Sequence, residues 1–118
     1  MNNQFALIIE DDDILGDIFA KSLEGIYTTE IVRDGLLALD RLDQTQPALV
    51  ILDLHLPGLS GKEILASIRS NPVLAQTRVI LCTADERTAD LLQDQADIVF
   101  LKPVNPGQLR QLATRFAN

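Results

Sequence analysis

The fold is indicated by one stretch of sequence, Val50-Ile51-Leu52-Asp53-Leu54-His55-Leu56-Pro57-Gly58. Its apolar first part is typical of a strand buried on both faces, and Pro57 and Gly58 then carry the chain away in a turn. Asp53 stands where the strand ends. Ligands bind at the carboxyl ends of the strands in open α/β sheets, and an unpaired buried carboxylate is costly. We therefore expect Asp53 to lie at the centre of the functional site.

Short apolar runs alternate with longer amphipathic stretches on both sides of this segment. The pattern predicts strands at residues 5–9, 27–32, 48–53, 79–82 and 98–101. It predicts helices at residues 14–23, 36–42, 60–68, 86–95 and 105–116. Continuously apolar strands and right-handed crossovers favour helices on both faces of a parallel sheet. We expect an α/β fold, a doubly wound five-stranded parallel sheet flanked by five helices in the flavodoxin-like three-layer sandwich. The pattern does not specify the order of the strands.

The helices differ in how strongly the sequence marks them. Ser60-Gly61-Lys62-Glu63 is a Ser-x-x-Glu capping box, and Asn105-Pro106 combines an N-cap residue with Pro at the first helical position. Asp12 and Asp13 are expected to cap the first helix and to occupy its first turn. The helix expected at 86–95 is the weakest. The apolar residues that it offers to the core are Ala89, Leu91, Leu92 and Ala96.

The composition indicates a single soluble domain over residues 1–118. The formal net charge is -7, with 17 acidic and 10 basic residues. That balance disfavours direct binding to nucleic acid or to anionic membranes. Cys82 is the only cysteine, which excludes an internal disulfide and fits a reducing compartment. No apolar run is long enough to span a bilayer, so we expect a cytoplasmic location.

Polar residues follow four of the predicted strands. Glu10 and Asp11 come after the first strand, Asp53 ends the third, Thr83 follows the fourth, and Lys102 follows the fifth. The carboxyl ends of parallel strands share one edge of the sheet, so three carboxylates, a hydroxyl and an ammonium group are expected to gather there. Each residue alone is weak evidence, whereas the set predicts a site.

The residue types indicate phosphoryl chemistry. Three carboxylates held close together repel one another and call for a divalent cation with oxygen ligands, for which Mg²⁺ is suited. A carboxylate is also a competent nucleophile toward phosphorus and can form an aspartyl-phosphate. The charge on a transferring phosphoryl group must be neutralised. We expect Mg²⁺, Lys102 and the Thr83 hydroxyl to share that task.

The chain resembles the receiver domains of two-component response regulators. The matching segments occur in the order of the family, at close to its spacings, and span essentially the whole chain. They are Leu7-Ile8-Ile9-Glu10-Asp11, Ile51-Leu52-Asp53 with Leu56-Pro57-Gly58 and Gly61, Leu81-Cys82-Thr83-Ala84, and Leu101-Lys102-Pro103. The combination is highly specific, although no single segment is.

The resemblance implies a role for each acidic residue at this edge. Asp53 would accept the phosphoryl group. Asp11 would bind Mg²⁺ directly, and Glu10 would assist through the waters of the metal. The backbone carbonyl of His55 would complete the protein ligands, and the His55 side chain is expected to face solvent.

The resemblance also implies the response to phosphorylation and the partners. Thr83 would move to hydrogen-bond the phosphoryl group, Lys102 would pair with it, and the bond from Lys102 to Pro103 would be cis. The phosphodonor would be a histidine kinase or a histidine phosphotransfer protein, and the output would be a downstream protein target. The domain would be a monomer or a weak phosphorylation-dependent dimer. Self-catalysed phosphorylation and dephosphorylation are the only reactions expected.

Three features depart from the family pattern. Glu10 replaces the commoner Asp, and its extra methylene should alter the water-mediated contact to the metal. The family often has an aromatic residue three positions before the lysine, but Val99 stands there and the aromatic follows at Phe100. Because Val99 is not aromatic, we expect no aromatic switch at position 99. The third departure is that the segment between Thr83 and Lys102 is somewhat short.

Two other functions compete with the phosphorylation switch. A haloacid-dehalogenase-like phosphatase would also use an aspartate nucleophile and Mg²⁺, but such enzymes carry a second Asp two residues later, where this chain has His55. A pseudo-receiver would bind partners without phosphate, and Val99 gives that interpretation some weight. The set of Asp11, Asp53, Thr83 and Lys102 weighs more heavily against it.

Overall fold

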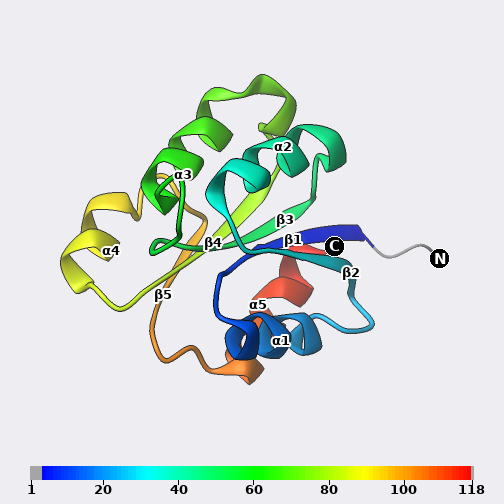
Figure 1. The fold of residues 1–118 in the computed structure, drawn as a ribbon. Coiled ribbons are helices and arrows are strands. Elements are labelled where there is room, and N and C mark those ends of the chain that lie inside the picture. The colour runs from blue at the N-terminus through cyan, green and yellow to red at the C-terminus, as the bar shows by residue number, and fades with distance from the viewer. Residues whose placement is uncertain (1–3, 118) are drawn as a thin grey trace.

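The computed structural model describes residues 4–117 and contains one sheet of five parallel strands in the order β2-β1-β3-β4-β5 (Figure 1). The strands are β1 (Gln4–Ile9), β2 (Tyr27–Val32), β3 (Leu49–Asp53), β4 (Arg78–Thr83) and β5 (Ile98–Leu101). The helices are α1 (Asp13–Ser22), α2 (Gly35–Thr45), α3 (Gly61–Ser70), α4 (Glu86–Leu92) and α5 (Pro106–Phe116), with a short 3-10 turn at Pro72–Leu74. The predicted α/β fold is confirmed.

Alternate residues of the central strands pack into two separate cores. Leu7 and Val50 belong to the core that lies under α2, α3 and α4, whereas Ile8 and Ile51 belong to the core under α1 and α5. Figure 1 shows the two helical layers on opposite faces of the sheet. Burial on both faces explains why these strands are continuously apolar.

The strand order places the change of direction between β1 and β3. The chain moves outward from β1 to β2 on one side, and from β3 through β4 to β5 on the other. The connections that leave β1 and β3 therefore diverge at the carboxyl edge of the sheet, which is where ligands bind in open α/β folds. Ile9 pairs with Leu52, so the residues that follow them, Glu10 and Asp53, come side by side.

The helix starts agree with the capping signals in the sequence. The Ser60 hydroxyl accepts a hydrogen bond from the Glu63 amide at 3.3 Å, and the Glu63 carboxylate accepts one from the Ser60 amide, which completes the capping box. Asp12 caps α1 and Asn105 caps α5, with Pro106 at the first helical position. These local predictions are confirmed.

Several expectations about individual residues are wrong. The helix expected to reach Gln95 ends at Leu92, and Leu91, which was expected in the core, is 66% exposed because the short helix covers the sheet with one side only. The 3-10 turn at Pro72–Leu74 was not predicted.

The residues of β5 are half-buried or exposed, because this strand lies at the edge of the sheet. No helix within residues 4–117 is long and apolar enough to cross a membrane.

Candidate functional site

Three carboxylates meet at the carboxyl edge of the sheet, where β1 and β3 end. Glu10, Asp11 and Asp53 each offer an oxygen atom, and these atoms all lie within 4.8 Å of one another. Glu10 is 1% exposed and Asp53 is 3% exposed, whereas Asp11 faces solvent. The predicted cluster of acidic residues is therefore present, with one member open to solution.

Glu10 is the most unusual member of this cluster. Its Oε2 accepts a hydrogen bond from the Asp12 amide at 3.2 Å, but its buried Oε1 has no hydrogen-bond partner among residues 4–117. Burial, which the Asp12 amide only partly offsets, raises the pKa of Glu10 to about 7, and the neighbouring Asp53 adds to the rise. A buried oxygen without a partner is costly and indicates a ligand position.

Lys102 supplies the positive charge at this site. Its Nζ lies 3.1 Å from Asp53 Oδ1, to which it donates a hydrogen bond, and 3.8 Å from Glu10 Oε1. Partial burial would lower the pKa of Lys102, but the hydrogen bond and charge of Asp53, with the charge of Glu10, raise it above its ordinary value. The bond from Lys102 to Pro103 is cis, as the resemblance implied.

Thr83 ends β4 next to this group, and its side chain is fully buried. Its Oγ1 accepts a hydrogen bond from the Asp85 amide at 3.1 Å. Asp85 is the N-cap of α4 and accepts hydrogen bonds from the Arg87 amide at 3.0 Å and the Thr88 hydroxyl at 2.7 Å. The hydroxyl expected to respond to phosphate thus accepts a hydrogen bond from the N-cap residue of α4.

The loop between β3 and α3 brings a backbone donor to Asp53. The His55 amide donates a hydrogen bond to Asp53 Oδ1 at 3.2 Å, and the residue is exposed, as predicted. The loop ends at Gly61, where an added methyl group would lie 2.5 Å from the Leu54 Cα and 2.7 Å from the Asp53 carbonyl oxygen. Only glycine lets α3 begin this close to the end of β3.

The donor set suits a small divalent cation. Three carboxylates face one ammonium group, so the cluster carries an excess of negative charge when it is ionised. Within residues 4–117, Glu10 Oε1 accepts no hydrogen bond and has only the Lys102 ammonium at 3.8 Å, so it would gain from a metal or from metal-bound water. The residues present therefore fit Mg²⁺, which prefers hard oxygen ligands and retains several waters.

Arg33 lies beside the acidic residues, although it was not among the residues expected at the site. Its Nη2 lies 2.7 Å from Asp13 Oδ1 and donates a hydrogen bond to the Asp11 carbonyl oxygen at 3.4 Å. The signal available in the sequence was its position directly after the predicted strand at 27–32, at the same edge of the sheet. The contact joins the β2–α2 connection to the start of α1.

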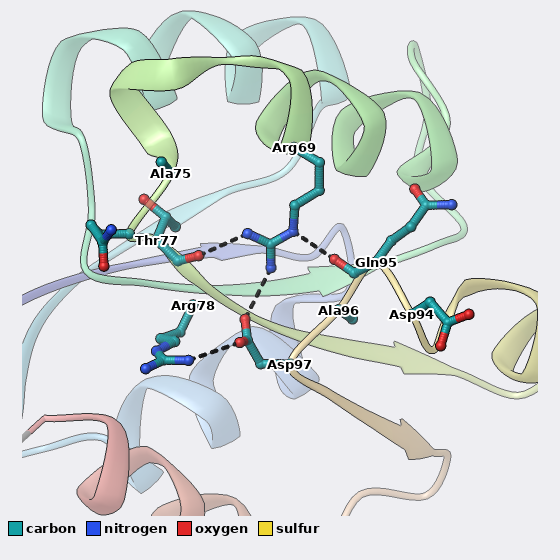
Figure 2. A pocket seen from close by; sticks show the side chains of 9 residues that line it. Arg69, Ala75, Thr77, Arg78, Asp94, Gln95, Ala96 and Asp97 are labelled. Carbon is teal, nitrogen blue, oxygen red and sulfur yellow. Dashed lines mark hydrogen bonds and ion pairs between the residues drawn. The ribbon is translucent and has the colours of Figure 1, made fainter.

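A cavity of about 250 Å³ lies at the opposite edge of the sheet (Figure 2). Arg69 donates hydrogen bonds to the carbonyl oxygens of Thr77 and Gln95 and to the Asp97 carboxylate, which also pairs with Arg78. Arg69, Arg78 and Asp97 therefore satisfy one another. Among residues 4–117, the one buried side-chain oxygen or nitrogen without a hydrogen-bond partner, Glu10 Oε1, lies at the carboxyl edge instead.

Comparison with known proteins identifies the family. A family model described as the response regulator receiver domain matches residues 6–114. The DNA-binding response regulator MtrA of Mycolicibacterium paratuberculosis is 31% identical over 110 residues, which cover 90% of this chain and 48% of MtrA. The chain thus spans about half the length of this relative.

Two solved structures share the fold. The signal receiver domain of a signal transduction histidine kinase from Syntrophus aciditrophicus has a TM-score of 0.86 at 30% identity, covering 97% of this chain and 89% of that one. The receiver domain of the sensor histidine kinase PA1611 from Pseudomonas aeruginosa PAO1 has a TM-score of 0.85 at 23% identity, covering 98% of each chain. That structure has a magnesium ion coordinated in its active-site cleft.

Proposed function

The chain belongs to the response regulator receiver domain family, and we propose that residues 1–118 form one receiver domain whose Asp53 accepts a phosphoryl group. The phosphodonor would be a histidine kinase or a histidine phosphotransfer protein. The observation that carries the proposal is the position of Asp53, which is buried beside Lys102 and within the group of three carboxylates. A structural aspartate would not need that surplus of acidic neighbours.

The hydrogen bonds at Asp53 suggest which oxygen reacts. Lys102 and the His55 amide both donate to Oδ1, so we assign the attack to Oδ2. The new bond joins Oδ2 to phosphorus as the phosphorus–nitrogen bond of the phosphohistidine breaks, and the imidazole leaves with the bonding electrons. Lys102 would then neutralise an oxygen of the phosphoryl group.

Glu10, Asp11, Asp53 and the backbone carbonyl of His55 are the groups that would hold Mg²⁺. The ion would supply neutralising charge to the transferring phosphoryl group. Asp11 is exposed and open to a metal that arrives from solution, whereas Glu10 is buried behind it. Glu10 would act through metal-bound water, which would supply the hydrogen bond that its Oε1 lacks.

Thr83 connects the phosphoryl site to the output surface in this proposal. If its hydroxyl turns to the phosphoryl group, the Asp85 amide loses its acceptor and the start of α4 must adjust. We propose that the face formed by α4, β5 and α5 then changes its preference for a downstream protein. Leu91 and Leu101 are exposed apolar side chains on α4 and β5.

The pseudo-receiver remains the second candidate. Val99 stands three positions before Lys102, where receiver domains often carry an aromatic residue that acts as a switch. Asp53→Asn separates the two functions. A scaffold keeps its partner binding in this variant, with or without a phosphodonor. A phosphorylation switch loses the response to the donor.

The net charge bears on nucleic-acid binding by this domain alone. The acidic charge disfavours nucleic-acid binding by this domain, yet MtrA is a DNA-binding response regulator and the chain matches about half of it. The expectation of no nucleic-acid partner therefore receives no support from the comparison. We propose a monomer or a weak phosphorylation-dependent dimer for the domain itself.

The test of the proposed function is intact mass after incubation with acetyl phosphate and Mg²⁺. One added phosphoryl group is expected, and it should be absent from Asp53→Asn and from a metal-free sample. If a folded wild-type domain gains no phosphoryl group from acetyl phosphate or from a phosphohistidine donor, the switch is rejected in favour of the scaffold.

A further inference from the structure

The start of α2 lies in backbone contact with the loop that joins β3 to α3. The Gly35 amide donates a hydrogen bond to the Pro57 carbonyl oxygen at 3.2 Å. A methyl group added at Gly35 would lie 2.4 Å from the Leu59 carbonyl oxygen and 2.9 Å from the Leu59 nitrogen. These are backbone atoms, which cannot turn aside as a flexible side chain can. The contact therefore requires glycine at position 35.

The N-cap of α2 reinforces this contact. Asp34 accepts hydrogen bonds from the Leu36 and Leu37 amides at 2.8 and 3.2 Å, so its carboxylate is held at the end of the helix. A methyl group on Gly58 would lie 3.1 Å from Asp34 Oδ2. Gly58 also has a φ of 81°, a conformation that other residues adopt only with strain. The turn at Gly58 therefore packs closely against the Asp34 carboxylate that caps α2.

The same loop carries groups of the phosphorylation site. It leaves β3 at Asp53, passes through His55, whose amide binds Asp53 Oδ1, and ends where the Gly61 amide donates to the Leu54 carbonyl oxygen at 3.1 Å. The start of α3 thus holds both ends of the loop close together. The start of α2 holds its middle, at residues 57–59.

We propose that Gly35 is a positioning residue for the phosphorylation site. By admitting the backbone of residues 57–59 against α2, Gly35 holds the His55 backbone beside Asp53 in the geometry that the metal requires. Gly35 acts through the loop and does not itself bind the ion or the phosphoryl group. The inference rests on the proposed function, because it concerns the same metal site.

The test compares Gly35→Ala with the wild-type domain in two measurements. Mg²⁺ affinity is measured by isothermal titration calorimetry, and backbone exchange of residues 54–60 is followed by hydrogen–deuterium exchange without metal. Displacement of a group that supports a metal ligand typically weakens binding by about 10- to 100-fold. We expect a rise of about 10-fold or more in the Mg²⁺ Kd and faster exchange in the loop.

Gly25→Ala is the matched control. Gly25 has a φ of 83°, so the substitution strains the turn between α1 and β2, but an added methyl group would meet no atom within 4 Å. This turn lies at the other edge of the sheet. The control should lower the Tm, yet leave the Mg²⁺ Kd and the exchange of residues 54–60 unchanged. General destabilisation alone therefore cannot imitate the expected result.

Gly58→Ala disturbs the same contact from the loop side. If Gly35→Ala does not fold, the Mg²⁺ affinity and loop exchange of Gly58→Ala test the inference instead. Weaker Mg²⁺ binding in either folded variant, with the control unchanged, supports the inference. Wild-type affinity and loop exchange in the folded variants overturn it while leaving the proposed function intact. A folded wild-type domain that binds no Mg²⁺ overturns both.

Discussion

Lys102 Nζ lies 3.1 Å from Asp53 Oδ1, and this ion pair joins the end of β5 to the end of β3 across the intervening strand β4. The Asp53 side chain is almost fully buried and the Lys102 side chain is 23% exposed. The pair therefore lies in a partly dry environment, where a charge is expensive to leave alone. Both partners also belong to the proposed phosphorylation site.

Lys102→Ala is expected to slow phosphoryl uptake by about 100-fold or more, because the developing charge on the phosphoryl oxygens loses a positioned cation. The rate of mass gain with acetyl phosphate and Mg²⁺ measures the effect. Lys21→Ala removes an equal charge from the last turn of α1 and should react at the wild-type rate. Equal rates for the two variants would argue against a role for Lys102 in transfer.

Glu10→Gln is expected to stabilise the metal-free domain at pH 8, by about 1–3 kcal/mol. At this pH the wild-type carboxylate is ionised although it is buried, whereas the amide is neutral and has the same shape. Mg²⁺ should stabilise the wild-type domain more than the variant, because a metal-site carboxylate is lost. Urea unfolding with and without Mg²⁺ tests both statements. If Mg²⁺ raises the free energy of unfolding equally in the variant and the wild type, Glu10 does not contribute to metal binding.

Thr83→Ala is expected to separate phosphorylation from its output. Asp53 should still gain a phosphoryl group, but the resonances of α4 should no longer shift, because no hydroxyl links the phosphoryl group to the Asp85 amide. Thr83→Ser keeps the hydroxyl and should preserve the shifts. Amide NMR spectra with and without beryllofluoride measure this, and α4 shifts that persist in Thr83→Ala would place the switch elsewhere.

Asp97→Asn is expected to destabilise the domain by about 1–3 kcal/mol at pH 7, because the carboxylate accepts hydrogen bonds from Arg69 and Arg78 (Figure 2) and from the Val79 amide. Burial alone would raise the pKa of Asp97, but these partners lower it below the ordinary 3.8. A lowered pKa means stability that is present above pH 3.8 and is lost as pH falls through the folded-state value.

The difference between wild type and Asp97→Asn should therefore shrink as pH falls below about 3.8. Urea unfolding from pH 7 to pH 3 measures it. Asp94→Asn is the matched control, since Asp94 lines the same cavity and Figure 2 draws no interaction to its side chain. A constant difference across this range would mean that the charge of Asp97 does not matter.

Much of the site could be predicted from the sequence because its residues are marked locally. Asp53 follows an apolar strand and precedes a Pro-Gly turn, and Glu10 with Asp11 follows another such strand. Whether a helical residue faces the core was less predictable at helix ends. Ile14 is 72% exposed although it belongs to the apolar pattern that predicted the helix at 14–23, whereas Gly16 in the same first turn of α1 is buried.

By itself, the sequence determined the alternation of strands and helices, the helix caps and the chemistry of the site residues, since these depend on neighbours within a few positions of the chain. Only the tertiary structure decided the strand order that sets Glu10 beside Asp53, the ion pair from Lys102, and the close contact of Gly35 with Leu59. These contacts join residues far apart in the chain. They form only when both cores pack in one arrangement of the strands and helices. A local sequence pattern does not specify which distant residues become neighbours in that arrangement.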